Sequence, residues 1–103
     1  MSLQVQGEHA ATGFVIRVSG AISGLNAEQL EVPLLEASSS LTVPVALDFT
    51  AVTYISSAGL RVLVMAAKKL HARGARLELR HPQPSVATVL RVSNFSTFLD
   101  IVA

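Results

Sequence analysis

The spacing of apolar and polar residues indicates one long helix in the second half of the chain. Between residues 57 and 73, apolar side chains recur every three or four positions, which is the spacing of a single helix face. These residues are Leu60, Leu63, Val64, Ala67 and Leu70. Gly74 follows, and a glycine in the left-handed conformation commonly ends a helix. The pattern therefore predicts a helix from about Ser57 to Arg73.

A nearly continuous apolar run, Val43–Phe49, lies shortly before this helix. Such a run is typical of a strand covered on both faces, and it predicts a central strand. Pro44 fits near the first residue, where a missing backbone donor is tolerated. Alternating residues at 77–80 predict another strand, which His81 and the prolines that follow it end.

The N-terminal segment alternates apolar and polar residues at Leu3–Gln6 and, in part, at Phe14–Ser19. These two runs predict an antiparallel hairpin. The turn is expected over His9–Gly13, with His9 as a loop residue.

Two shorter helices are predicted on either side of these central elements. Asn26 and Gln29 have capping-box spacing before an apolar face made of Leu30, Leu34 and Ala37. Pro33 interrupts this helix, so we expect a kink or a helix that is regular on only one side. The run Ser38–Ser40 is expected to end it.

The C-terminal segment predicts a helix capped by Ser85 and running through Val92. Its inward-facing residues are expected to be Val86, Val89 and Leu90. A closing turn and short strand follow, with the apolar residues Phe95, Phe98, Leu99 and Ile101.

Strands and helices thus alternate along a chain of 103 residues, which is the length of one domain. Half of the residues are apolar and only 5% are aromatic, so the core must be built from Val, Leu, Ile and Ala. We expect a single α/β domain over residues 1–103. Its central sheet is expected to be mixed and mostly parallel, with four to five strands and three to four helices.

Charge is divided unevenly, although the formal net charge is only +1. Residues 1–60 hold five acids and one base, whereas residues 61–103 hold seven bases and two acids. The bases of the long helix fall on different sides of it, and no aromatic residues interleave with them to stack on bases. We therefore expect no direct nucleic-acid binding.

Other classes of function lack support in the sequence. There is no cysteine, and His71 and His81 lack further metal ligands at useful spacing. A hydrolase nucleophile would require glycine two residues before the serine, where Ile55 stands before Ser57. No apolar run reaches the ~18 residues of a membrane helix, and no signal peptide is visible. We expect a cytoplasmic protein without catalytic activity, metal or cofactor.

The candidate chemistry lies at Ser56 and Ser57, where the long helix is expected to begin. The first backbone N–H groups of a helix lack partners, and the dipole places partial positive charge there. A serine in this position can cap the helix, contributing ~1 kcal/mol. It can also accept a phosphoryl group, because the same features suit an anion. Residue types alone favour the cap and do not choose between the two serines.

A family resemblance changes this balance. The segment Tyr54-Ile55-Ser56-Ser57-Ala58-Gly59-Leu60, preceded by Leu47-Asp48-Phe49 and Val52, resembles the signature of the STAS family of anti-sigma factor antagonists and sulfate-transporter domains. Three further stretches share the family pattern, namely Gly20-Ala21-Ile22, Gly74-Ala75-Arg76-Leu77 and Val92–Ile101.

The resemblance implies that the chain is an anti-sigma factor antagonist, with Ser57 as the residue that accepts phosphate. Its partner would be an anti-sigma factor that is also a serine kinase of the histidine-kinase-like ATPase type. The implied partner-binding residues are Ser23, Ser56, Ser57, Ala58, Gly59 and Arg61. A homodimer is left open. Asp48 also matches the family, but its position near a strand end favours a structural role.

Two departures from the family pattern favour an alternative. Many phosphorylated members carry acids at the positions of Ser23 and Ser56. A STAS module without them is also expected to work as a non-phosphorylated scaffold in a stress-signalling complex, or as an accessory subunit of a lipid-transport system.

Overall fold

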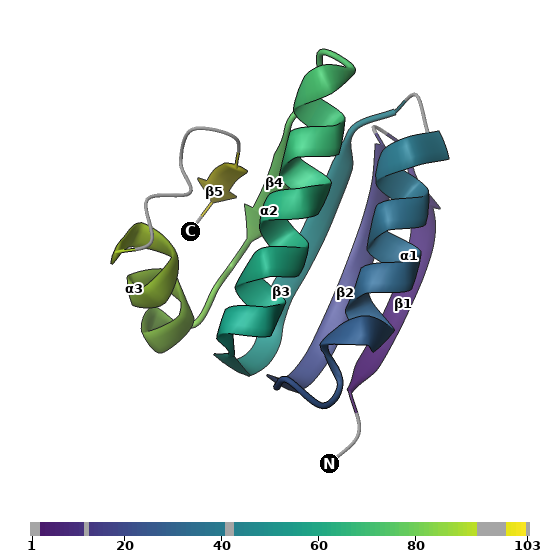
Figure 1. Cartoon of the computed structure of the whole chain (residues 1–103). Helices are drawn as coiled ribbons and strands as arrows, with labels where there is room; N and C mark the ends of the chain where they lie inside the picture. The colour runs from purple at the N-terminus through teal and green to yellow at the C-terminus, as the bar shows by residue number, and fades with distance from the viewer. Residues whose placement is uncertain (1–2, 12, 41–42, 93–98, 103) are drawn as a thin grey trace.

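A computed structural model describes residues 3–11, 13–40, 43–92 and 99–102. Within these ranges it contains five strands and three helices (Figure 1). The strands are β1 (Gln4–Ala10), β2 (Gly13–Ile22), β3 (Val45–Ile55), β4 (Leu77–Arg80) and β5 (Leu99–Val102). The helices are α1 (Ala27–Ser40), α2 (Ser57–Ala72) and α3 (Pro84–Val92).

The strands form one sheet in the order β1-β2-β3-β4-β5. β1 and β2 are antiparallel, with Val5 opposite Val18, and each later pair is parallel. The predicted α/β fold with a mixed, mostly parallel sheet is therefore confirmed, and β3 is the central strand as expected.

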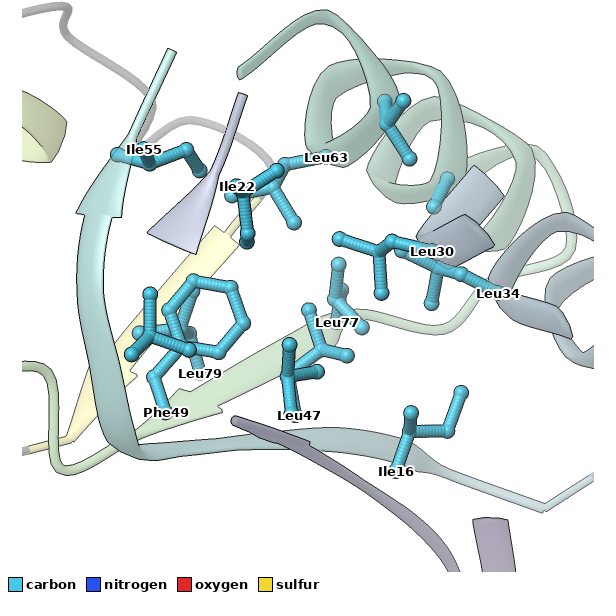
Figure 2. Close-up of a cluster of buried hydrophobic side chains, with 14 of the residues drawn as sticks. Ile16, Ile22, Leu30, Leu34, Leu47, Phe49, Ile55, Leu63, Leu77 and Leu79 are labelled. Atoms are coloured by element: carbon cyan, nitrogen blue, oxygen red, sulfur yellow. The ribbon is translucent and has the colours of Figure 1, made fainter. Parts of the chain in front are cut away.

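One face of the sheet is covered by α1 and α2, which lie side by side (Figure 1). Their buried side chains meet those of the strands in a single core (Figure 2). The largest contributors are Phe49, Ile16, Ile22, Leu30, Leu34, Leu47, Leu63, Leu70, Leu77, Leu79 and Leu90. α3 joins the same core through Val86 and Leu90. The core has a single aromatic ring among these residues, as the composition required.

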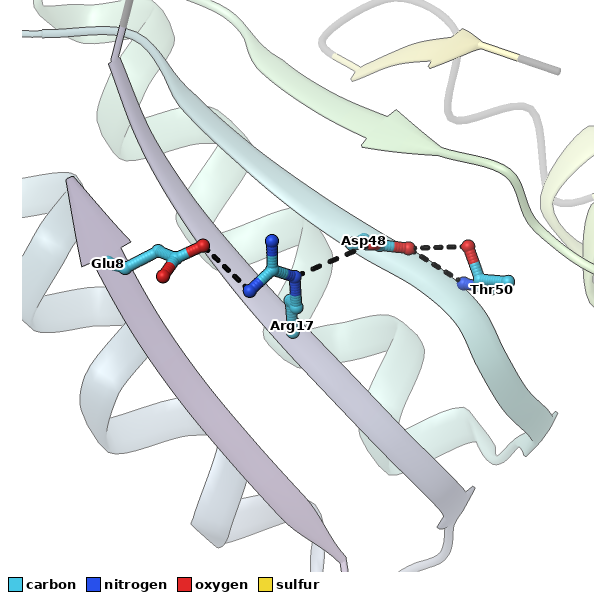
Figure 3. A network of polar contacts seen from close by, with 4 residues as sticks. All are labelled: Glu8, Arg17, Asp48 and Thr50. Carbon is cyan, nitrogen blue, oxygen red and sulfur yellow. Dashed lines mark hydrogen bonds and ion pairs between the residues drawn. The ribbon is translucent and has the colours of Figure 1, made fainter. Parts of the chain in front are cut away.

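The opposite face of the sheet carries polar side chains, and the helices lie behind it in Figure 3. Arg17 on β2 pairs with Glu8 on β1 at 2.7 Å and lies 4.0 Å from Asp48 on β3. The prediction that the run Val43–Phe49 is covered on both faces is therefore wrong. Ala46 is buried on this face, but Asp48 is only half-buried, so the apolar run breaks at the aspartate.

Asp48 lies at a β-bulge. Arg17 is paired with Asp48 and Ser19 with Ala51, so β3 has one more residue than β2 between these two pairs. A bulge leaves the extra residue unpaired in the ladder. The Asp48 carboxylate accepts hydrogen bonds from the Thr50 backbone N–H at 3.0 Å and from its Oγ1 at 2.6 Å (Figure 3). The aspartate thus binds the irregular backbone, which is the structural role predicted for it.

Several predicted boundaries differ from the structure. β3 continues to Ile55, beyond the predicted end at Phe49, and leads directly to the two serines. The turn predicted over His9–Gly13 is shorter, because His9 lies within β1. Its ring packs edge-on against Phe14, with ring centroids 4.9 Å apart. This aromatic contact keeps His9 in the strand, where the sequence pattern had suggested a loop.

The helices also depart from prediction in their details. α1 is helical on both sides of Pro33, and the side chain of Asn26 bonds to the preceding loop rather than capping the helix. α3 begins at Pro84, one residue before the predicted cap at Ser85, and Val89 is exposed. The predicted residues Phe95 and Phe98 lie outside the described ranges.

The buried face of α2 is rotated relative to the apolar face that the sequence predicts. Its buried residues are Gly59, Val62, Leu63, Ala66, Ala67 and Leu70. Leu60 and Val64 are only half-buried. The helix ends as expected, since Gly74 follows the C-cap Arg73 with a φ of 77°. The Arg73 side chain donates to the Ser38 carbonyl at 2.6 Å and ties the end of α2 to α1.

Candidate functional site

The predicted site residues come from the β2–α1 loop and from the start of α2, at the same edge of the sheet. β2 and β3 are parallel neighbours, so the β2–α1 and β3–α2 connections both leave at their carboxyl ends. Ile22 is paired with Ile55, and the Ser56 N–H donates to the Ile22 carbonyl at 2.8 Å. In open α/β sheets this edge is where ligands bind. Because the two strand ends are bonded to each other, Ser23 lies close to Ser56 and Ser57.

Ser56 is the N-cap of α2. Its backbone is extended, with φ −86° and ψ 172°, and its Oγ accepts a hydrogen bond from the Gly59 N–H at 3.2 Å. Its carbonyl accepts from the Leu60 N–H at 2.9 Å, which is the first backbone bond of the helix. The hydroxyl of Ser56 is thus engaged in holding the first turn, and the residue is half-buried.

Ser57 is the first residue of α2 and is exposed. Its hydroxyl has no hydrogen-bond partner within the part of the chain that the structure describes. The two adjacent serines therefore differ: one hydroxyl caps the helix and the other is presented to solvent. This division could not be read from the residue types.

The residues after Ser57 have distinct environments. Ala58 is half-buried against the core, and Gly59 is buried. A Cβ on Gly59 would approach Ile22 Cγ2 to 2.7 Å and Ile55 Cγ1 to 2.8 Å. Gly59 thus lets α2 pack closely on the two strand ends, and its role as a partner contact stays a prediction.

The charges around Ser57 favour an anion. The first turn of α2 contains no acidic residue, and Arg61 is exposed one turn after Ser57. The positive end of the helix dipole adds to this arrangement. The start of α2 is therefore locally favourable to an anion at the exposed hydroxyl, whereas the first turn of the neighbouring α1 carries the exposed acid Glu28.

The β2–α1 loop is held by a compact set of hydrogen bonds. The Ser23 N–H donates to Asn26 Oδ1 at 2.8 Å, and Asn26 Nδ2 donates to the Ala21 carbonyl at 2.9 Å. The Ser23 hydroxyl accepts from the Leu25 N–H at 3.2 Å, and its carbonyl accepts from the Ala27 N–H at 3.0 Å. Ser23 is thus half-buried and shapes the loop.

Leu25 is a feature of this edge that the sequence reasoning missed. Its exposed fraction is 99%, the highest among the large apolar side chains of the described residues. The available signal was an apolar residue between Gly24 and Asn26, in a segment that belongs to neither the strand nor the helix pattern.

Asp48 lies away from this edge, on the open face of the sheet. The hydrogen bonds from the Thr50 hydroxyl and backbone N–H lower the pKa of its carboxyl below the ordinary value of 3.8, and His81 and Arg17 act in the same direction. Burial opposes this shift but does not cancel it. The carboxylate is consequently ionised at neutral pH, as a partner for the bulge and for Arg17.

No group of three or more potential metal ligands occurs among residues 3–11, 13–40, 43–92 and 99–102. In the same ranges, every helix is too short or too polar to cross a bilayer.

Comparison with known proteins gives consistent matches. Residues 5–102 match the family model described as Mlab, STAS domain. A Bordetella bronchiseptica protein provisionally named anti-sigma factor antagonist BtrV is 36% identical over 84 residues, covering 82% of this chain and 72% of that protein.

Solved structures share the fold. The anti-sigma factor antagonist SpoIIAA in its unphosphorylated form gives a TM-score of 0.80 at 22% identity, over 97% of this chain and 89% of that chain. The phosphorylated form of SpoIIAA from Bacillus gives 0.75 at 20% identity, over 97% and 92%. At these identities the similarity concerns the fold.

Proposed function

The chain belongs to the STAS domain family, and we propose that it is an anti-sigma factor antagonist controlled by phosphorylation of Ser57. The observation that carries this proposal is the unequal use of two adjacent serines. Ser56 caps α2, while Ser57 presents an exposed hydroxyl at the same helix start. The name of BtrV, the 36% identical relative, supports the same function.

In the unmodified form, the protein docks onto an anti-sigma factor that is also an ATP-using serine kinase of the histidine-kinase-like type. The docking surface consists of the first turn of α2 and the β2–α1 loop, which lie at one edge of the sheet. Holding the anti-sigma factor frees the sigma factor in the cytoplasm. The protein itself acts as a binding module, and this role requires no catalytic group or cofactor.

Phosphorylation changes the charge of this surface. A phosphoserine carries roughly −1.5 to −2 charges at neutral pH. Within the free protein, the positive end of α2 accommodates that charge. Within the complex, an unpaired charge that is cut off from water costs several kcal/mol, and each 1.4 kcal/mol is a tenfold loss of affinity. One phosphate is therefore enough to release the partner.

The choice of Ser57 over Ser56 follows from the geometry. A kinase must reach the hydroxyl oxygen from solvent, and the Ser56 oxygen already accepts the Gly59 N–H from a half-buried position. Phosphorylating Ser56 would disturb the cap, whereas phosphorylating Ser57 leaves that bond in place.

One observation favours a second candidate, a STAS scaffold or accessory subunit that binds without being phosphorylated. The family acids near the acceptor are replaced here by Ser23 and Ser56. The Ser23 hydroxyl accepts from the Leu25 N–H in its loop, and the Ser56 hydroxyl accepts from the Gly59 N–H in the first turn of α2. If acids at these positions assist the kinase, their absence would leave a constitutive binding surface.

Calorimetric titration with a purified serine kinase of the histidine-kinase-like ATPase type from the same organism tests the proposal. We expect Ser57→Asp to bind at least about tenfold more weakly than wild type. Ser57→Ala is the matched control, and it should bind within about threefold, because it removes the acceptor without adding charge. If Ser57→Asp binds as tightly as wild type, the scaffold function is favoured and the switch is wrong.

A further inference from the structure

We propose that Leu25 is the apolar anchor by which this partner kinase holds the protein while it reaches Ser57. The inference rests on the proposed function and adds the residue that supplies affinity. It is carried by the exposure of Leu25 together with the rigid loop that presents it beside the acceptor serine.

The exposure of Leu25 is unusual even within this chain. The next most exposed large apolar side chains among the described residues are Val92 at 80%, and Val32 and Tyr54 at 57%. Leu25 is 99% exposed and contributes almost nothing to the core of the free protein. Its full side chain is available for burial in a complex, and buried apolar anchors near the centre of an interface carry much of the binding energy.

The loop around Leu25 is organised before any partner arrives. The Leu25 N–H is bound by the Ser23 hydroxyl, and the residues on either side are fixed by the Asn26 side chain and by the first backbone bonds of α1. Binding through a pre-organised loop loses little conformational entropy. The backbone around the anchor has therefore already lost most of its conformational entropy in the free folded protein.

Leu25 and Ser57 are close enough to lie under one partner. Ile22 is paired with Ile55, strands are about 4.8 Å apart and successive Cα atoms about 3.8 Å, so the Cα atoms of Leu25 and Ser57 are at most about 24 Å apart. A standard interface covers about 800 Å² on each partner, which corresponds to a patch roughly 32 Å across. One patch of this size can therefore include both Ser57 and Leu25.

Charge complementarity indicates which kind of partner fits. Glu28 is exposed in the first turn of α1, on the side of the anchor, whereas the first turn of α2 lacks acids and Arg61 is exposed. An ATP-holding kinase brings the negative phosphates of its nucleotide to Ser57, and these phosphates match the positive helix end. The kinase should thus offer an apolar pocket for Leu25 next to its nucleotide site.

The test measures binding and phosphorylation by the same purified kinase. We expect Leu25→Ala to weaken binding by roughly 10- to 100-fold. Leu25→Met should retain affinity within about threefold, because it keeps the apolar volume. Val43→Ala is the matched control, since Val43 is 37% exposed just before β3, at the end of the sheet opposite to Ser57.

The kinetics separate an anchor from a general defect. Leu25→Ala should raise the KM for phosphorylation with little change in kcat, and its thermal midpoint should equal that of wild type. If wild type is bound and phosphorylated on Ser57 while Leu25→Ala binds within twofold of it, the anchor is overturned and the proposed function stands. If the kinase neither binds nor phosphorylates the wild-type protein, both proposals are overturned.

Discussion

The buried face of α2 and its first turn belong to one helix but meet opposite requirements. The buried face packs Leu63, Ala66 and Leu70 into the core, where each is at most 1% exposed. The start of the helix leaves Ser57 and, one turn later, Arg61 in solvent, and its first turn is capped by Ser56. Stability is therefore concentrated along the helix body, and the chemistry is concentrated at a tip that contributes little to stability.

The sharpest way to test this contrast is to remove a side chain from the buried face. Leu63→Ala should lower the free energy of unfolding by ~2 to 5 kcal/mol, because it leaves a cavity in the core. Chemical denaturation measures the loss. A loss below about 1 kcal/mol would show that the body of α2 is not where stability resides.

The next largest effect is expected at the cap. Ser56→Ala should lower the free energy of unfolding by ~1 kcal/mol, since the Gly59 N–H loses its acceptor. Ser56→Asp is the matched control, because aspartate also caps and suits the positive helix end, so it should stay within about 0.5 kcal/mol of wild type. Equal losses for the two variants would contradict the capping role.

A smaller effect is expected at Asp48, which supports the bulge in the strand leading to α2. Asp48→Asn should cost about 0.5 to 1 kcal/mol at pH 7, because hydrogen bonds to the charged carboxylate weaken. The folded pKa lies below 3.8, so the stabilisation is fully present above the unfolded pKa and is lost as pH falls through the folded pKa.

Denaturation curves from pH 7 to pH 2 check this dependence. The difference between wild type and Asp48→Asn should shrink at the acid end of the range. A difference that is constant with pH would show that the carboxylate charge does not contribute.

The smallest change in stability is expected at the tip itself. Ser57→Ala should alter the free energy of unfolding by less than about 0.5 kcal/mol, because the side chain is exposed and its hydroxyl has no partner in the described ranges. Chemical denaturation alongside Ser56→Ala gives the direct comparison. A larger loss for Ser57→Ala than for Ser56→Ala would reverse the assignment of the two serines.

Much of the fold was predictable because the spacing of apolar residues and the residues that end helices and strands indicate the same elements. The start of α2 at Ser57 and its end before Gly74 were anticipated, and so was the central place of β3. The errors have physical reasons. β3 extends to Ile55 because two bulges accommodate polar residues that interrupt the regular alternation. The prediction that the run is covered on both faces failed because Asp48 lies on the open face of the sheet.

The site was only partly predictable. The sequence pattern located Ser56 and Ser57 but did not distinguish a cap from a free hydroxyl, because both serines suit either role. Gly59 allows α2 to pack closely, because a Cβ at this position would come too close to Ile22 and Ile55. The sequence pattern does not show that these three residues meet. Leu25 escaped notice because exposure in a loop leaves no periodic signal.

The most direct test of the central claim is to map the phosphate after the protein is incubated with the purified serine kinase and ATP. Tandem mass spectrometry should place a single phosphate on Ser57, and Ser57→Ala should remain unmodified although Ser56 is intact. A phosphate on Ser56, or no phosphate on a protein that the kinase binds, would contradict the account.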